Sequence, residues 1–161
     1  MLIAAITAYS VSVFIHITAV VVGFGATFAE SLMFPVAQKL DPKHLPYVHK
    51  LQMTINRALA TPALLIVIVT GIYQVSEGNW SFGDFWISAT FLIVIVIGGL
   101  LGAYFVPSDR RLGAQVERDL AETGEPSAAY LDAARKQGMV GALTGFLLVL
   151  AIFLMVTKPG A

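Results

Sequence analysis

The chain has 161 residues, of which 57% are hydrophobic and only 12% are charged. That charged fraction is about half of the roughly 25% that is usual in soluble domains. Cysteine is absent, which excludes disulfides, iron–sulfur clusters, thiolate zinc sites and covalently attached c-type haem. Ten Lys and Arg balance ten Asp and Glu, so the formal net charge is zero and no nucleic-acid partner is expected.

Four long apolar stretches explain this composition, and each is long enough to cross a bilayer. They cover residues 3–29, 58–75, 85–106 and 139–157, and two longer polar segments, 30–57 and 107–138, connect them in pairs. The sequence therefore predicts an all-α fold, an integral membrane four-helix up-down bundle, as a single membrane domain over residues 1–161. The lipid bilayer is therefore an expected partner of this chain.

The first stretch carries no charge and holds one ionisable group, His16, near its middle. On a helical wheel, a set of polar and small residues falls within roughly 40° of one line. These residues are Tyr9, Ser12, His16, Gly23, Thr27 and Glu30. Unsatisfied polar groups in hydrocarbon cost several kcal/mol each, so we expect this stripe to face the interior of the bundle.

The segment after the first span contains a helix start and two charged residues near the membrane surface. Asp41-Pro42 predicts that start, with Asp as the cap and Pro in the first turn. Pro62 lies inside the same helix and should kink it. Glu30 and Arg57 are expected either to form an ion pair or to leave Arg57 free to bind a cofactor carboxylate.

The second half of the chain shows small-residue patches and a further polar helix. We expect residues 109–122 to form a short interfacial helix, Gly124 to break it, and Ser127 to cap the last helix. Two sets of glycines predict close helix packing. They are Gly98, Gly99 and Gly102 in the third span, and Gly138, Gly141 and Gly145 in the fourth.

The distribution of basic residues predicts the orientation in the membrane. Nine of the ten Lys and Arg lie in the two longer connecting segments, and the short loop between spans two and three has none. By the positive-inside rule both longer segments are cytoplasmic and both termini lie outside. We therefore expect the cytoplasmic (inner) membrane as the location.

His16 is the strongest candidate for chemistry, because ionisable groups inside membranes are expensive and mark functional sites. Neutral imidazole binds haem iron, copper or zinc, and Gly23 would leave room beside it for a flat ring. A b-type haem would then use His16 as metal ligand, with Gly23 beside it and Arg57 toward its propionates. The alternative is that His16 forms a hydrogen bond with a hydroxyl on a neighbouring helix and so holds the bundle together.

No second His lies within a span, so a haem on His16 would be five-coordinate or would take a sixth ligand such as Met. His44 and His49 lie in the cytoplasmic segment and are five residues apart. Residues at this spacing do not lie on one face of a helix, so a metal site formed by this pair is not expected. No catalytic residue is predicted.

The first helix resembles that of a group of small bacterial membrane proteins. The likeness rests on His16 to Val20, Gly23 and the run from Leu32 to Pro35. Thr70-Gly71 at the end of span two and the run from Met155 to Pro159 are similar to a family of uncharacterised four-span predicted integral membrane proteins.

The same helix is also similar to that of the haem-containing membrane protoporphyrinogen oxidase, and more loosely to the copper resistance D membrane domain. In the oxidase family the histidine of the first helix is a haem ligand, and His16 matches it. That family also uses a Lys in its third span, which residues 85–106 lack. The resemblance thus implies a haem site without the oxidase activity, and the copper-type Met or His pairs within the spans are missing.

Two classes of function follow. One is a small membrane protein that binds b-type haem in a redox or haem-related role. The other is a non-catalytic accessory subunit or assembly factor of a larger membrane complex, with other membrane subunits or further copies of this chain as partners.

The orientation is testable because the chain contains no native cysteine. Single cysteines placed at Gly78 and at Gly124 should react with an impermeant thiol reagent from opposite sides of the membrane. Labelling of both positions from the same side would contradict the four-span topology.

Overall fold

The computed structural model describes residues 6–160, and all the regular structure in this range is helical. Residues 3–5 of the first predicted span lie outside the described residues. The α-helices are α1 (Ala8–Lys39), α2 (Leu45–Ile55), α3 (Thr61–Glu77), α4 (Phe85–Gly99), α5 (Val106–Thr123) and α6 (Ala128–Thr157). Short helical turns join some of them: η1 (Pro42–His44), η2 (Asn56–Ala60) and η3 (Leu100–Phe105).

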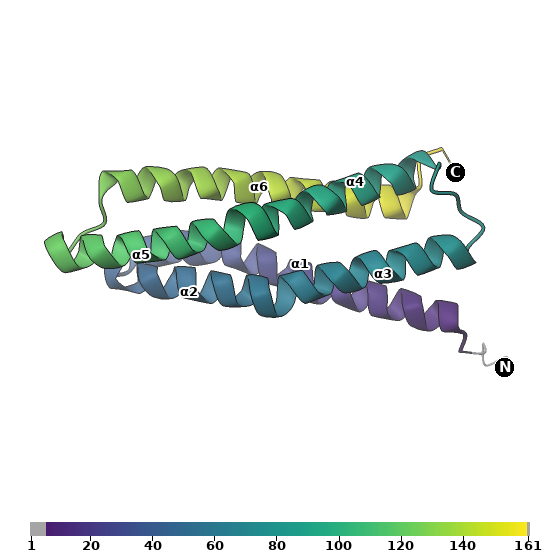
Figure 1. Ribbon diagram of the computed structural model, residues 1–161, viewed down its shortest axis with the longest axis horizontal. Helices are drawn as coiled ribbons and strands as arrows, with labels where there is room; N and C mark the ends of the chain where they lie inside the picture. Colours follow the sequence, from purple (N-terminus) through teal and green to yellow (C-terminus); the bar gives the residue numbers. More distant parts are fainter. Residues whose placement is uncertain (1–5, 161) are drawn as a thin grey trace.

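These elements form four long helical rods (Figure 1). The first and last rods are α1 and α6, while η1 to α3 and α4 to α5 make the second and third, over Pro42–Glu77 and Phe85–Thr123. All four rods are long and apolar enough to cross a membrane, which confirms the predicted fold class. They contain 30 to 39 residues and are therefore about 45–58 Å long, well beyond the roughly 30 Å of hydrocarbon.

Two prolines explain why the middle rods contain wider turns and do not break. The turns η2 and η3 are π-helical, and Pro62 and Pro107 follow them by two residues. Proline offers no N–H and crowds the carbonyl four residues before it, so the bond shifts to the fifth residue back. The Thr61 N–H accordingly donates to the Asn56 carbonyl. The helix predicted over residues 109–122 is present within α5 (Val106–Thr123), but it is not a separate short helix, because η3 joins it to α4 in one rod.

The predicted helix ends are confirmed. The Asp41 side chain accepts a hydrogen bond from the Lys43 N–H, and the Ser127 hydroxyl accepts one from the Tyr130 N–H. Gly124 ends α5 with a φ of 77°, the left-handed conformation that glycine adopts easily. Asp119 joins the two helices across this turn, and hydrogen bonds from the Ser127 hydroxyl and N–H hold the pKa of its carboxyl below its usual value.

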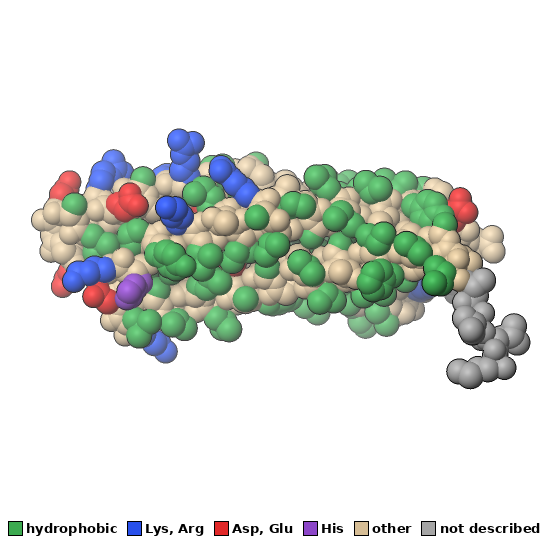
Figure 2. Space-filling view, turned by 90° about the horizontal axis from the view of Figure 1, so that it is seen from below, with side chains coloured by type: hydrophobic (Ala, Val, Ile, Leu, Met, Phe, Trp, Pro, Cys, Tyr) green, Lys and Arg blue, Asp and Glu red, His purple; other side chains and the backbone are tan. Residues whose placement is uncertain are grey.

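Charged side chains gather at one end of the bundle, which we call the charged end (Figure 2). It contains the end of α1, all of α2 and α5, and the first turns of α6. On the face shown, hydrophobic side chains predominate over the rest of the bundle, and few charged side chains lie there. At the opposite end, the Lys158 ammonium lies 4.2 Å from the centre of the Trp80 ring and ties α6 to the loop between α3 and α4.

The polar stripe of α1 faces the interior, as predicted. Ser12, Gly23 and Glu30 are buried, and α1 packs mainly against α3. Tyr9 is the exception, because it is exposed at the start of the helix. At Gly23 the two helices meet so closely that an added Cβ would lie 2.5 Å from the Cβ of Ala63.

Most of the other predicted small-residue contacts are absent from the structure. An added Cβ would find no atom within 4 Å at Gly99, Gly102, Gly138 or Gly141. Gly98 packs against Leu64, and Gly145 lies near Phe28. The predicted glycine seam of α6 was therefore wrong for two of its three members, because those two face away from neighbouring helices.

Gly23 provides a stability test with a matched control on the same helix. Gly23→Leu should lower the free energy of unfolding by about 1–3 kcal/mol, because it overpacks the contact with Ala63. Gly25→Leu should cost much less, since an added Cβ there meets nothing within 4 Å. The measurement is unfolding of the purified protein by titration with sodium dodecyl sulfate. Equal losses in the two variants would contradict the close contact.

Candidate functional site

His16 lies on α1 and contacts α3 through a defined hydrogen bond. Its Nδ1 atom is 2.8 Å from the Thr70 hydroxyl oxygen. That hydroxyl donates its own proton to the Ile66 carbonyl, 2.6 Å away, so Thr70 accepts from the N–H of His16. The Nε2 atom of the neutral ring then carries a free lone pair. No hydrogen bond to Nε2 is found within residues 6–160, and the side chain is partly exposed.

The space predicted beside His16 is not where the sequence placed it. Gly23 and Ala19 are both covered by α3, where Ala19, Ala63 and Val67 form a small buried cluster. Room for the imidazole comes instead from Gly71, because an added Cβ there would lie 3.6 Å from Cε1 of His16. Thr70 therefore binds His16, and Gly71 leaves the space beside its ring open.

Arg57 lies apart from His16. Thr70 is hydrogen-bonded to His16 and therefore lies at the same depth. It follows Arg57 by 13 residues on the second rod, so Arg57 is about 20 Å from this depth. Arg57 instead lines an open cavity of about 440 Å³ together with Arg110 and Arg111. Three guanidinium groups around one cavity suit an anion such as a lipid phosphate.

The expected ion pair between Glu30 and Arg57 was wrong. Glu30 is only 7% exposed and forms no salt bridge within the described residues, while Arg57 is exposed. The buried stripe of α1 directs Glu30 into the bundle. Burial, and then the negative charge of Asp109, raise the pKa of Glu30 to about 8. Glu30 lies just beyond the first predicted span, at the charged end.

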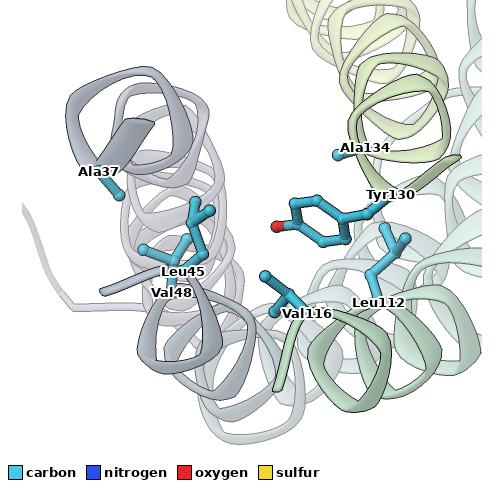
Figure 3. Packing of buried hydrophobic residues seen from close by; sticks show 7 residues of the cluster. All are labelled: Ala37, Leu45, Val48, Leu112, Val116, Tyr130 and Ala134. Atoms are coloured by element: carbon cyan, nitrogen blue, oxygen red, sulfur yellow. The ribbon is translucent and has the colours of Figure 1, made fainter. Parts of the chain in front are cut away.

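A chain of buried polar side chains crosses the charged end and was not predicted. His49 lies between Tyr130 and Asp109, with Nε2 2.8 Å from the Tyr130 hydroxyl and Nδ1 3.4 Å from Oδ1 of Asp109. Gln137 donates to the same Oδ1 and accepts from the Ser108 hydroxyl. Figure 3 shows the Tyr130 ring reaching from α6 into the space between α1, α2 and α5.

The hydrogen-bond partners determine which atoms of this buried polar chain carry protons. Burial, and then the negative charges of Asp109 and Asp119, raise the pKa of the Tyr130 hydroxyl, so it stays protonated and donates to Nε2 of His49. His49 therefore carries its proton on Nδ1 and donates to Asp109. Both nitrogens of His49 are therefore occupied by protein partners, and neither is free to bind a ligand.

Helical periodicity carried a signal for this chain. His49 shares the buried face of α2 with Leu45 and Val48, and Asp109 precedes the buried Leu112 by three residues. His44, by contrast, is exposed and does not join His49. Over residues 6–160, no three His, Cys, Asp or Glu side chains gather as a metal-ligating group.

Tyr130 tests the importance of the buried chain. Tyr130→Phe removes the donor to Nε2 of His49 and leaves a buried acceptor unpaired, which should cost about 1–3 kcal/mol of unfolding free energy. Tyr47→Phe is the control, because Tyr47 is 65% exposed at the same end of the bundle. Detergent-titration unfolding of the two variants should separate them clearly. A Tyr130 variant as stable as the control would contradict the hydrogen-bond assignment.

Comparison with known proteins supports the membrane assignment. No curated protein and no solved structure matches the chain. The similarity to the haem-containing oxidase and to the copper resistance D proteins is not shown and stays a prediction. Residues 10–159 match the family described as "Predicted integral membrane protein (DUF2269)", and the chain therefore belongs to that family of predicted integral membrane proteins.

Proposed function

We propose that this membrane protein binds a b-type haem through Nε2 of His16. The observation that carries the proposal is the hydrogen bond from Nδ1 to Thr70, which leaves Nε2 as the ligating atom. A ligating histidine usually donates its other N–H in this way, which fixes its tautomer and raises its basicity. His16 lies eight residues from the start of α1, about 12 Å into the bundle, where a haem would lie within the bilayer.

The imidazole of His16 is a suitable ligand for haem iron, and the packing around it limits where a haem would lie. The contact between α1 and α3 at Gly23 leaves no space for a porphyrin between these helices, so the ring would lie on the Nε2 side. A bound haem would supply one-electron redox chemistry. Arg57 is about 20 Å away along the rod and is not part of this arrangement.

The test is the absorbance spectrum of protein produced with haem supplied. Wild-type protein should show a Soret band, and His16→Ala should lose it while still inserting into the membrane. Thr70→Val should keep the ligand but weaken haem binding by roughly 10–100-fold, because Nδ1 loses its acceptor. His44→Ala is the control and should bind as wild type does. Absence of a Soret band from the wild-type protein would contradict the proposal, and His16 would then be a structural hydrogen-bonding residue.

A second candidate is an accessory subunit of a larger membrane complex. It is favoured by an open apolar groove of about 290 Å³ between α1 and the second rod, lined partly by Ala19, Ala58, Pro62 and Ala63. Small residues on a lipid-facing groove allow another transmembrane helix to approach closely. Stable co-purification with other membrane subunits and no chromophore would support this candidate over haem binding.

A further inference from the structure

We propose that the charged end of the bundle contains a binding site for a hard divalent cation, formed by Glu30, Gln52, Asn56 and Asp109. This site is separate from His16 and does not depend on haem binding. Each of the four residues has a buried side-chain oxygen without a hydrogen-bond partner: Oε1 of Glu30 and Gln52, Oδ1 of Asn56 and Oδ2 of Asp109. Glu30, Asn56 and Asp109 are only 7%, 3% and 2% exposed.

The contacts between helices place three of these oxygens, those of Glu30, Gln52 and Asp109, at nearly the same depth. Phe34, His49 and Tyr130 form one layer, with ring centres 5.8–6.4 Å apart, and the Cβ of His49 lies 3.4 Å from where a Cβ on Gly113 would be. Glu30 on α1, Gln52 on α2 and Asp109 on α5 each lie about one helical turn from this layer, toward the apolar end of the bundle. Asn56 lies one further turn along the second rod, at the start of η2.

The hydrogen bonds around Asp109 leave one of its oxygens free for a ligand. His49 and Gln137 both donate to Oδ1, and neither contacts Oδ2. Tyr130 and Ser108 hold His49 and Gln137 in turn. Partners of this kind, which orient a ligating carboxylate, are typical of metal sites.

The backbone at Asn56 is also arranged unusually. Its carbonyl accepts both the N–H and the hydroxyl of Thr61 in the π-helical turn, so the side-chain oxygen remains the unpaired acceptor. Single π-helical turns inside α-helices are frequent at functional sites. Asn56 is the first residue of this turn and lies on the buried side of the rod.

The donor set selects the chemical class of the cation. All four free atoms are oxygens, two from carboxylates and two from amides, which suits Ca²⁺, Mg²⁺ or Mn²⁺ and not zinc or copper. Within residues 6–160, neither carboxylate forms a salt bridge with Lys or Arg. Two ionised carboxylates would balance one divalent cation. The competing occupant is a proton on Glu30, and the experiment must separate the two.

The experiment uses the full chain in lipid nanodiscs, stripped with EDTA and titrated with Ca²⁺ or Mg²⁺ at constant ionic strength. The proposal predicts a saturable rise in the unfolding temperature with one of these ions. It also predicts that Tb³⁺ binds with one-to-one stoichiometry and is sensitised by Tyr130, which lies beside the site. Tyr130→Phe should reduce the sensitised emission.

Three variants and one control decide between the cation and the proton. Glu30→Gln and Asp109→Asn should weaken cation binding about tenfold or more, since each removes a charged ligand. Asn56→Asp should bind more tightly but unfold at a lower temperature in EDTA, because it adds a buried charge. Glu117→Gln, on the exposed side of α5, should bind as wild type does.

The proposal is overturned by any of three results. The first is no saturable response of the wild-type protein to either ion. The second is an equal response in Glu30→Gln and wild type. The third is a Glu30→Gln variant that is more stable than a cation-insensitive wild type, which would show that Glu30 holds only a proton. None of these results depends on the Soret band that tests His16.

Discussion

The length of the helical rods relative to the bilayer governs the rest of this structure. Rods of 30 to 39 residues reach about 45–58 Å, so roughly a third or more of each must lie outside the roughly 30 Å of hydrocarbon. Within the hydrocarbon the helices meet mainly through small, aliphatic and aromatic side chains, and the hydrogen bond between His16 and Thr70 is a polar contact among them. Outside the hydrocarbon, at the charged end, polar groups can be buried inside the bundle at a lower cost, because water and headgroups lie close to them. The bundle therefore has an apolar core and a polar core along one axis.

The prolines connect these two regions without interrupting the rods. Pro62 and Pro107 each lie two residues after a π-helical turn, and both are close in the chain to the first basic residues of the charged end, Arg57 and Arg110. A break at either point would expose backbone groups close to hydrocarbon. The wider turn keeps their hydrogen bonds within the rod. Two buried polar residues lie close to these turns: Asn56 is the first residue of η2, and Asp109 follows Pro107 by two residues.

Much of this fold could be predicted from the sequence, because hydropathy and helix caps are local properties. The four spans, the caps at Asp41 and Ser127 and the inward stripe of α1 all follow from residues near one another in the chain. Periodicity indicates that His49 and Asp109 lie on buried faces, but it could not show that they belong to one polar chain, since the chain joins residues 60 and 81 positions apart. Glu30 and Arg57 were paired because both lie near the membrane surface, but depth alone does not show that one faces inward and the other outward.

The two histidines show how their partners determine what each can do. In both, Nδ1 donates to an oxygen: the Thr70 hydroxyl for His16 and the Asp109 carboxylate for His49. The difference is at Nε2, which accepts from Tyr130 in His49 and is free of any described protein partner in His16. His49 is therefore closed to a ligand and instead orients Asp109, whose second oxygen remains unpaired. Among the described residues, Nε2 of His16 and Oδ2 of Asp109 therefore lack protein partners, while His49 is fully paired and positions the groups around it.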